Sequence, residues 1–320
     1  MSEKRVVITR KIPGVLEMDG VRVETGPPEF PERAALLERV SGADAIVAMY
    51  ADRVDAEMLD AAGDSLECVC NFAVGYDNVD LGACRERGVI ACNTPDAVTE
   101  GTADLAWALI LAVARRVVEA DRFTRTRDYP EGGPLGMAEW LGADLTGRTL
   151  LVVGGGRIGF ATAMRSLGWG MKVLYTSRER KWNFELAPLA AERVELDEGL
   201  ARADVVSINC ALNDETRGLI DAHRLGLMKP GAILVNTARG PIVDEGALVE
   251  ALAQGRIWGA GLDVFEREPE VHPGLIASDR CVLTPHIGSA ARRYREMMTE
   301  IVARNVNAVF AGKEPPNRIA

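Results

Sequence analysis

Short apolar runs alternate with segments of helical periodicity through the N-terminal third of the chain. The apolar runs, each four to six residues long, are typical of buried strands, and the segments between them carry apolar residues at helical spacing. Such alternation predicts βαβ units and a parallel sheet. The expected strands are 6–9, 45–49, 67–72 and 88–91, and the expected helices are 34–40, 56–62 and 81–87.

A second series of apolar runs follows from residue 149 onward. Its expected strands are 149–153, 172–175, 205–209, 232–236, 259–263 and 281–284. We therefore predict an α/β protein with two parallel-sheet domains in tandem.

Two long helical patterns suggest how the domains connect. One covers 100–121, with Thr99 as its cap, and could bridge the domains; the other covers 290–310 near the C-terminus. Because the last helix has only earlier elements to pack on, we expect it to return to the first domain. The predicted domains are 1–98 plus 288–320, and 99–287, with the active site in the cleft between them.

Charge and hydropathy exclude some partners. The 320 residues carry a formal net charge of -10, which disfavours nucleic acids and anionic membranes as partners. The longest apolar stretch, 103–114, contains Asp104 and is too short to span a bilayer. An anionic substrate would need a local positive site in this acidic protein.

Cysteine usage indicates a reducing compartment. None of the six cysteines forms a paired zinc pattern, and Cys68 and Cys70 are too close in sequence for one, so we expect buried reduced thiols and no metal. The N-terminus runs directly into the strand 6–9 rather than into a signal peptide. We expect a cytoplasmic protein.

A glycine-rich turn indicates dinucleotide binding. Gly154, Gly156 and Gly159 follow the strand 149–153 and open a helix that runs through 160–167. In this context the first glycine permits the turn, the second lets the backbone approach a pyrophosphate, and the third lets helix and strand pack closely. Ile158 and Arg157 also lie within the turn. Arg157 either contacts a phosphate or is a solvated arginine. The fold expected is two Rossmann-like/flavodoxin-like domains.

The end of the next strand indicates which dinucleotide is preferred. An NAD enzyme usually has an acidic residue about 20 residues beyond the glycine turn. This chain has Ser177 and Arg178 there, with Arg180 and Lys181 close behind. A serine and an arginine would accept the extra phosphate of NADP(H), so we predict NADP(H) preference with NAD(H) possible. The alternative is a solvated basic turn.

Acid–base candidates can be compared directly, because the chain has only three histidines. His223 begins a polar helix and His272 lies in a loop. His286 follows the strand 281–284, at the carboxyl end where ligands bind in open α/β sheets. Histidine side chains in general have a pKa near 6.5, which suits proton donation.

Two further candidates also follow strands. Glu268 comes after the strand 259–263 and could orient an imidazole and keep it protonated. Arg239 comes after the strand 232–236, and its planar guanidinium can hold a carboxylate and polarise a neighbouring keto oxygen.

The motifs around these residues resemble those of the D-isomer-specific 2-hydroxyacid dehydrogenases, and within that family the glyoxylate/hydroxypyruvate reductases. The resemblance covers essentially the whole chain. It rests on residues 71–80 (NFAVGYDNVD), 93–95 (NTP), 235–245 (VNTARGPIVDE), 261–269 (GLDVFEREP) and 284–288 (TPHIG).

The resemblance implies roles for individual residues. Arg239 binds the substrate, and Glu268 supports His286 as proton donor. The backbone amides of Val74 and Gly75 receive the substrate carboxylate. The resemblance also implies contacts with the cofactor from Thr102, Cys210, Ala238 and Asp263. Trp140 is implied to reach the active site of a partner subunit.

The chain departs from the family at two places. Where the family often shows His-x-Pro-Leu-Thr, residues 209–213 read NCALN, which leaves the cofactor contacts of that loop open. Ala291 and Arg292 replace a more common small polar pattern, which leaves the substrate range open.

Together these features predict an NADPH-dependent reductase of a small anionic 2-oxo acid, glyoxylate or hydroxypyruvate, and the resemblance implies a homodimer. Two alternatives stay open. One is a related dehydrogenase acting on 3-phosphoglycerate or a longer 2-oxo acid, and the other is a non-catalytic NADP(H)-sensing scaffold.

Overall fold

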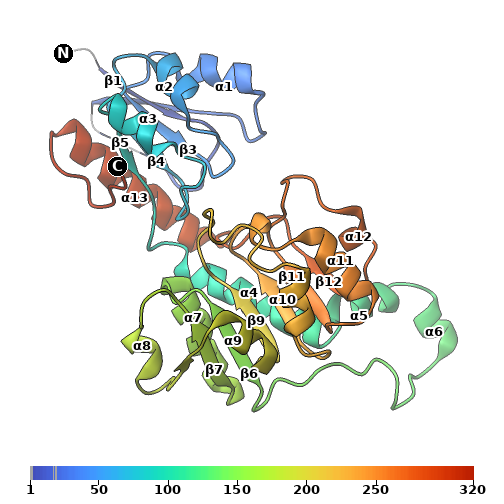
Figure 1. The fold of residues 1–320 in the computed structure, drawn as a ribbon. Helices are drawn as coiled ribbons and strands as arrows, with labels where there is room; N and C mark the ends of the chain where they lie inside the picture. The colour runs from blue at the N-terminus through green and yellow to red at the C-terminus, as the bar shows by residue number, and fades with distance from the viewer. Residues whose placement is uncertain (1–2, 17, 19) are drawn as a thin grey trace. The chain divides into compact units, whose positions relative to one another are not determined.

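The structure, a computed structural model, describes residues 3–16, 18 and 20–320. The chain divides into two compact units: unit 1 is Met1–Thr99 with Ser289–Ala320, and unit 2 is Glu100–Gly288. Each unit has its own parallel sheet flanked by helices (Figure 1). The predicted α/β class with two parallel sheets is confirmed.

Unit 1 contains a five-stranded sheet in the order β2-β1-β3-β4-β5, with every neighbouring pair parallel. This order is that of flavodoxin-like folds. The strands are β1 (Lys4–Ile8), β2 (Val21–Thr25), β3 (Ala45–Ala48), β4 (Cys68–Asn71) and β5 (Ile90–Cys92). The helices are α1 (Arg33–Val40), α2 (Ala56–Ala62), α3 (Leu81–Glu86) and α13 (Arg292–Phe310).

The central strands β3 and β4 of unit 1 are buried along their whole length, as in a sheet covered on both faces. Val7, Ile46 and Val69 face a core shared with Leu36 of α1 and Met58 of α2. The C-terminal helix α13 packs against β4 in the same unit.

Unit 2 contains a seven-stranded parallel sheet in the order β12-β11-β10-β9-β6-β7-β8. The chain order reverses between β6 and β9, so the crevice beyond these strands is the expected dinucleotide position. The strands are β6 (Thr149–Val153), β7 (Lys172–Thr176), β8 (Glu192–Arg193), β9 (Val205–Ile208), β10 (Ile233–Asn236), β11 (Gly259–Leu262) and β12 (Cys281–Leu283). The α-helices are α4 (Thr99–Ala114), α5 (Val117–Thr124), α6 (Asp128–Gly132), α7 (Arg157–Arg165), α8 (Trp182–Glu185), α9 (Leu196–Arg202), α10 (Ala222–Leu227), α11 (Glu245–Ala253) and α12 (Pro273–Ile276), with short 3-10 turns η1 (Ser166–Trp169) and η2 (Gly240–Ile242).

Successive residues of β6 enter two different cores. Leu150 and Val152 pack with α4 and α7, whereas Leu151 and Val153 pack with α9, α10 and α11. This double coverage explains why the central strands β6, β9 and β10 read as apolar runs.

Two strands were not predicted from the sequence, and one predicted helix is wrong in its extent. The edge strands β2 and β8 are partly or fully exposed and lack an apolar run. The predicted helix 100–121 stops at Ala114, and Arg116 takes a left-handed conformation with φ 54°. Beyond Ala114 the next helix buries no residue, so no packing energy holds the chain in line with α4.

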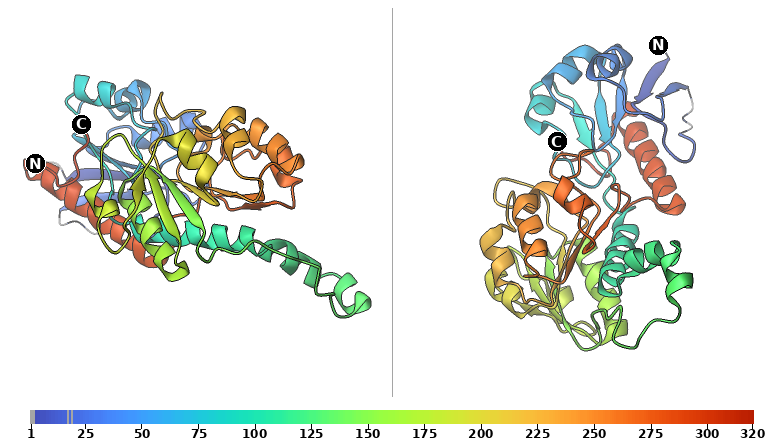
Figure 2. Two further views of the ribbon diagram at one scale, coloured as in Figure 1. Left: turned by 60° about the horizontal axis from the view of Figure 1, so that its bottom comes forward. Right: turned by 90° about the vertical axis from the view of Figure 1, so that its right-hand side faces the viewer.

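The segment that contains α5 and α6 extends away from the sheet of unit 2 (Figure 2). Neither helix has a buried residue, and several of the segment's large apolar side chains are exposed, among them Val117, Tyr129 and Met137. In the described part of the chain no helix is long and apolar enough to cross a membrane.

Candidate active site

The loop after β12 is held in place by a buried carboxylate. Asp263 is 1% exposed, and its Oδ1 accepts hydrogen bonds from Thr284 Oγ1 (2.7 Å) and Ile287 N (2.8 Å). Its Oδ2 accepts from Gly288 N (2.8 Å), and its carbonyl oxygen accepts from His286 N (2.8 Å). Burial raises the pKa of Asp263, an effect that these hydrogen bonds oppose. The loop therefore has a fixed shape around His286, whose φ is 53°.

His286 and Glu268 form a hydrogen-bonded pair. The imidazole Nδ1 lies 2.7 Å from Glu268 Oε2, and Phe265 N donates to Glu268 Oε1 (3.1 Å). An ionised carboxylate only accepts, so Nδ1 carries the proton of this bond. The opposite nitrogen, Nε2, is then the one that can exchange a proton with a ligand.

Arg239 follows β10 in a loop that Asn236 closes. Asn236 Nδ2 donates to Arg239 O (2.9 Å), and Asn236 Oδ1 accepts from Ala238 N (3.0 Å). The half-buried guanidinium donates from NH1 to Ala238 O (2.8 Å). A Cβ at Gly240 would lie 1.9 Å from the carbonyl of Phe265, so glycine is needed to bring this loop against the loop that carries Glu268.

These three loops follow β10, β11 and β12, which are neighbours in the sheet. Because the strands are parallel, all three loops lie at the same edge. The structure thus brings Glu268 and His286 into direct contact and places the loop of Arg239 beside them. That set can hold an anion and move a proton.

The glycine-rich turn lies at the same edge, between β6 and α7. A Cβ at Gly154, whose φ is 109°, would lie 2.6 Å from Cys210 N, and one at Gly159 would lie 2.2 Å from Gly154 O. A Cβ at Gly156, by contrast, would meet nothing within 4 Å. Gly156 precedes α7, whose N-terminus has no side-chain cap. Space and N–H donors are thus available for a phosphate.

The remaining residues of this turn are accessible to a ligand. Arg157, the first residue of α7, is exposed, and Ile158 is half-buried. Thr102 of α4 lies near the loop of His286, because a Cβ placed on Gly288 would lie 3.4 Å from the Thr102 side chain.

Ser177 and Arg178 form a turn beside the glycine-rich loop. A Cβ at Gly155 would lie 3.3 Å from Ser177 Cβ and 3.0 Å from Lys181 Cγ. Arg193 NH2 donates to the carbonyl oxygens of Ser177 and Arg178, each at 2.9 Å, and so holds the turn. The Arg178 side chain is exposed.

Arg180 is engaged away from this turn. Its Nε donates to Glu185 Oε2 (2.6 Å), and its guanidinium lies 3.9 Å from the centre of the Trp182 ring. Glu185 also accepts from Tyr175 OH (2.6 Å). Lys181 Nζ is likewise paired, with Glu179 Oε2 (3.3 Å).

Two polar atoms at this edge were not identified as candidates from the sequence. Asn209 Oδ1 and Thr237 Oγ1 are buried and have no hydrogen-bond partner within the described residues. Each residue directly follows a parallel strand, β9 or β10, and that position was the available signal. Cys210 is half-buried, and burial raises the pKa of its thiol to about 11. Unsatisfied buried oxygens beside an open glycine turn fit a polar ligand such as a dinucleotide.

Val74 and Gly75 lie in unit 1, in the loop after β4 and thus at the carboxyl edge of that sheet. Trp140 lies in unit 2, beyond α6, with φ 55°. Its ring is 5.1 Å from that of Phe123 and 4.6 Å from the guanidinium of Arg116. These contacts place Trp140 in the extended segment rather than beside Glu268 and His286.

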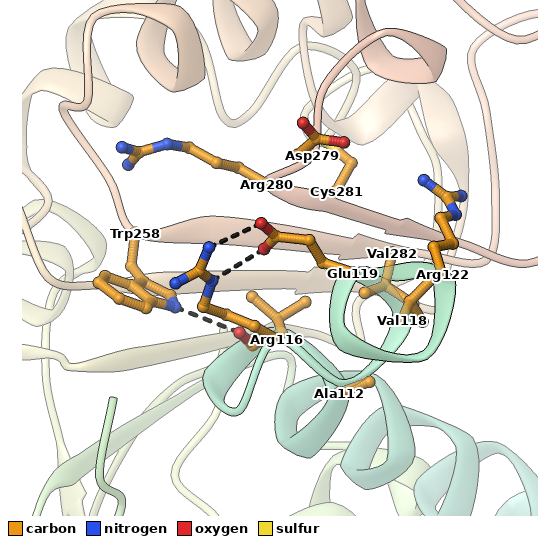
Figure 3. Close-up of a pocket in the computed structure, with 11 residues that line it drawn as sticks. Ala112, Arg116, Val118, Glu119, Arg122, Trp258, Asp279, Arg280, Cys281 and Val282 are labelled. Carbon is orange, nitrogen blue, oxygen red and sulfur yellow. Dashed lines mark hydrogen bonds and ion pairs between the residues drawn. The ribbon is translucent and has the colours of Figure 1, made fainter. Parts of the chain in front are cut away.

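A hollow of about 270 Å³ lies elsewhere on unit 2, at the amino ends of β11 and β12 (Figure 3). In it Arg116 pairs with Glu119 through two hydrogen bonds (2.8 and 2.6 Å), and Trp258 Nε1 donates to Val113 O (3.2 Å). The candidate residues for catalysis follow the carboxyl ends of the strands, so this hollow is a different place and we assign the chemistry to the carboxyl edge.

Comparisons with known proteins show what this chain is similar to. The family described as "D-isomer specific 2-hydroxyacid dehydrogenase, NAD binding domain" matches residues 107–288. A glyoxylate reductase of Thermococcus onnurineus is 49% identical, over 98% of this chain and 95% of that protein. A solved structure from Thermus thermophilus has a TM-score of 0.91 at 46% identity, covering 99% of this chain and 100% of that one. The NADPH-dependent glyoxylate/hydroxypyruvate reductase of Sinorhizobium meliloti, solved with NADP and malonate, has a TM-score of 0.84 at 32% identity, covering 100% and 97%.

Proposed function

Because the chain belongs to the D-isomer-specific 2-hydroxyacid dehydrogenases, and is therefore an NAD(P)-dependent oxidoreductase that reduces a 2-oxo acid, we propose that its substrate is glyoxylate or hydroxypyruvate and its preferred cofactor NADPH. The products would be glycolate or D-glycerate. The observation that carries the proposal is the bond between His286 Nδ1 and Glu268 Oε2 (2.7 Å) in a loop that Asp263 holds rigid.

Each side chain then has a definite task. His286 gives its Nε2 proton to the carbonyl oxygen, while Glu268 orients the ring and stabilises its charged form. Arg239 holds the substrate carboxylate and polarises the keto oxygen, and the N–H groups of Val74 and Gly75 receive the same carboxylate. The nicotinamide cofactor, when bound, supplies the hydride.

We propose that the cofactor is held at the carboxyl edge of unit 2. Space at Gly156 and the free N-terminus of α7 support the pyrophosphate position, and the buried oxygens of Asn209 and Thr237 support polar contacts nearby. Further proposed contacts come from Thr102, Gly154, Arg157, Ile158, Gly159, Cys210 and Ala238. Asp263 holds the loop of His286, and its contact with the nicotinamide end stays a prediction.

Two glycines of the turn should respond differently to alanine. In Gly159→Ala the new Cβ would lie 2.2 Å from Gly154 O, so we expect the free energy of unfolding to fall by about 1–3 kcal/mol. In Gly156→Ala nothing lies within 4 Å, so stability should change by less than about 0.5 kcal/mol while NADPH binding weakens. Urea unfolding without cofactor and fluorescence titration with NADPH measure the two effects. Equal stability losses in both variants would contradict this explanation.

NADPH preference rests on Ser177 and Arg178. Arg193 donates to the carbonyl oxygens of Ser177 and Arg178 and so fixes the turn, which offers the Ser177 hydroxyl and the Arg178 cation near the glycine turn. Arg180, which pairs with Glu185, is a further proposed contact with the cofactor.

Ser177→Asp should reverse this preference, because a carboxylate would repel the extra phosphate of NADPH. We expect the ratio of kcat/KM for NADPH to that for NADH to fall by about 10-fold or more. Ser177→Ala, which removes the hydroxyl without adding charge, is the control and should change the ratio less. An unchanged ratio in Ser177→Asp would remove Ser177 from the phosphate site.

The proposed activity is tested by the loss of reduced-nicotinamide absorbance with glyoxylate or hydroxypyruvate, with NADPH and NADH in parallel. Fast oxidation that favours NADPH supports both parts of the proposal. Faster oxidation of NADH would contradict the proposed phosphate site at Ser177 and Arg178 but would still support the proposed reductase activity. No turnover with these or longer 2-oxo acids, despite tight NADPH binding, would favour a sensor.

We also propose a homodimer in the cytoplasm. All six cysteines are free, which suits a reducing compartment. The exposed apolar residues of the extended segment, including Met137 (97% exposed), suit contact with a second copy. Light scattering at several concentrations would distinguish a dimer from a monomer.

A further inference from the structure

In unit 1 two buried asparagines hold the loop after β4 by its carbonyl oxygens. Asn93 Nδ2 donates to Val74 O (2.8 Å), and Asn71 Nδ2 donates to Gly75 O (2.8 Å). Asn71 is fully buried and Asn93 is 7% exposed. The loop is thus fastened from the interior of its own unit.

A planar trans peptide points its carbonyl and its N–H in opposite directions. The bond from Asn93 to Val74 O therefore sets the direction of the N–H of Gly75. In the same way, Thr94 N donates to Ala73 O (3.0 Å) and so sets the N–H of Val74. Both N–H groups point away from the donors that hold their peptides, and among the described residues neither has a hydrogen-bond acceptor. Two adjacent N–H groups turned outward in this way can receive an anion.

Asn93 is itself fixed by the C-terminal part of the chain. Its backbone N donates to Asn317 O (3.2 Å), and Asn305 Nδ2 donates to Asn93 O (3.3 Å). Asn305 lies on α13, is fully buried, and accepts from Asn317 N through Oδ1 (3.2 Å). These bonds join Asn93 to α13 and to the segment that follows the helix. The side-chain amide of Asn93 therefore has little freedom to move away from Val74 O.

Asn71 links the same loop to the one after β3. Asn71 Nδ2 also donates to Asn78 Oδ1 (3.0 Å), and Asn78 Nδ2 donates to the carbonyl oxygens of Met49 (3.1 Å) and Asp52 (2.9 Å). The two loops at this edge of the sheet are therefore held by one network of side-chain amides.

We propose that Asn93 is a positioning residue for substrate binding: it orients the Gly75 N–H toward the carboxylate of the 2-oxo acid without touching the substrate. Asn71, which holds Gly75 O, fixes the next peptide of the same loop. This inference rests on the proposed function, because it assumes that the loop receives the substrate carboxylate.

Asn93→Asp tests the proposal with almost no change in shape. An ionised carboxylate only accepts hydrogen bonds, so it cannot donate to Val74 O and would repel it. We expect KM for glyoxylate and Ki for the unreactive carboxylate oxamate to rise together, by about 10-fold or more, with a smaller change in kcat. The Kd for NADPH should be unchanged, since the proposed cofactor contacts lie in unit 2.

The pH dependence separates this role from a general loss of structure. At low pH the introduced carboxyl is protonated and regains an O–H donor toward Val74 O, and burial shifts this protonation toward neutral pH. The ratio of KM in Asn93→Asp to KM in the wild type should therefore fall as pH decreases. In Asn93→Ala, which has no donor at any pH, the ratio should stay high. Asn307→Asp, an exposed asparagine on α13, makes the same charge change and should behave like the wild type.

Three results would decide the matter. If KM and Ki in Asn93→Asp stay within about two-fold of the wild type, the positioning role is wrong. If KM and Ki both rise but the ratio of variant KM to wild-type KM does not fall at low pH, the hydrogen-bond explanation is wrong. If the wild type reduces no 2-oxo acid, the proposed function fails first, whereas wild-type turnover with an unchanged variant KM overturns only this inference. Thermal unfolding monitors the fold, and Asn93→Ser, which is too short to reach Val74 O, serves if Asn93→Asp does not fold.

Discussion

Replacing His286 by alanine is expected to lower kcat for glyoxylate by about 10²–10⁴-fold, the usual contribution of a general acid. The imidazole is held at Nδ1 by Glu268, which in turn accepts from Phe265 N, so Nε2 has a fixed direction. Proton donation occurs in the transition state, and its loss therefore appears chiefly in kcat. Stopped-flow single turnovers with saturating NADPH would measure the chemical step directly.

Matched variants make this result specific. His223→Ala removes an exposed histidine on α10 and should leave kcat unchanged. Glu268→Gln keeps the size of the side chain but loses its charge, so we expect a loss smaller than that of His286→Ala. Because the two residues act as a unit, the double variant should be about as slow as His286→Ala alone. Wild-type turnover in His286→Ala would show that another group donates the proton.

The central strands were predictable because burial on both faces leaves an unmistakable apolar run. Residues 205–209 and 232–236 were expected as strands, and β9 and β10 occupy them almost completely. The edge strands β2 and β8 carry half-exposed or exposed residues, and such short polar segments give no periodic signal. The break at Arg116 was not predicted either. The apolar pattern of 100–121 continues past Ala114, although its residues beyond Ala114 are no longer buried.

The candidate site was predictable to the extent that it depends on strand ends. His286 was chosen over His223 and His272 because it follows a strand, and the structure places it 2.7 Å from Glu268. His272 instead caps α12 by accepting from Gly274 N, a local role consistent with its loop position. Contacts between distant segments could not be derived in this way. The bond from Asn93 to Val74 O depends on how two strands lie in the sheet, and no sequence spacing encodes it.

Replacing Arg239 by alanine is expected to lower kcat/KM for glyoxylate by about 10²–10³-fold, the effect of deleting one electrostatic stabiliser. The loss should include a raised KM, because Arg239 would hold the substrate carboxylate as well as polarise the keto oxygen. The loop itself should persist: Asn236 still holds it through the backbone of Ala238 and Arg239, although the bond from the guanidinium to Ala238 O is lost. Unchanged thermal unfolding would verify this.

Arg239→Lys separates the effect of the positive charge from that of the planar guanidinium. An ammonium keeps the charge but loses the planar pair of donors that matches a carboxylate, so lysine should restore only part of the activity lost in alanine. Arg256→Ala removes an exposed arginine near the amino end of β11, at the opposite edge of the sheet, and should have no effect on kcat/KM. If Arg239→Lys were as active as the wild type, charge alone would suffice and two-point binding would be excluded. If Arg239→Ala kept near-normal turnover, the substrate carboxylate must be bound elsewhere, and the amides of Val74 and Gly75 would carry that role alone.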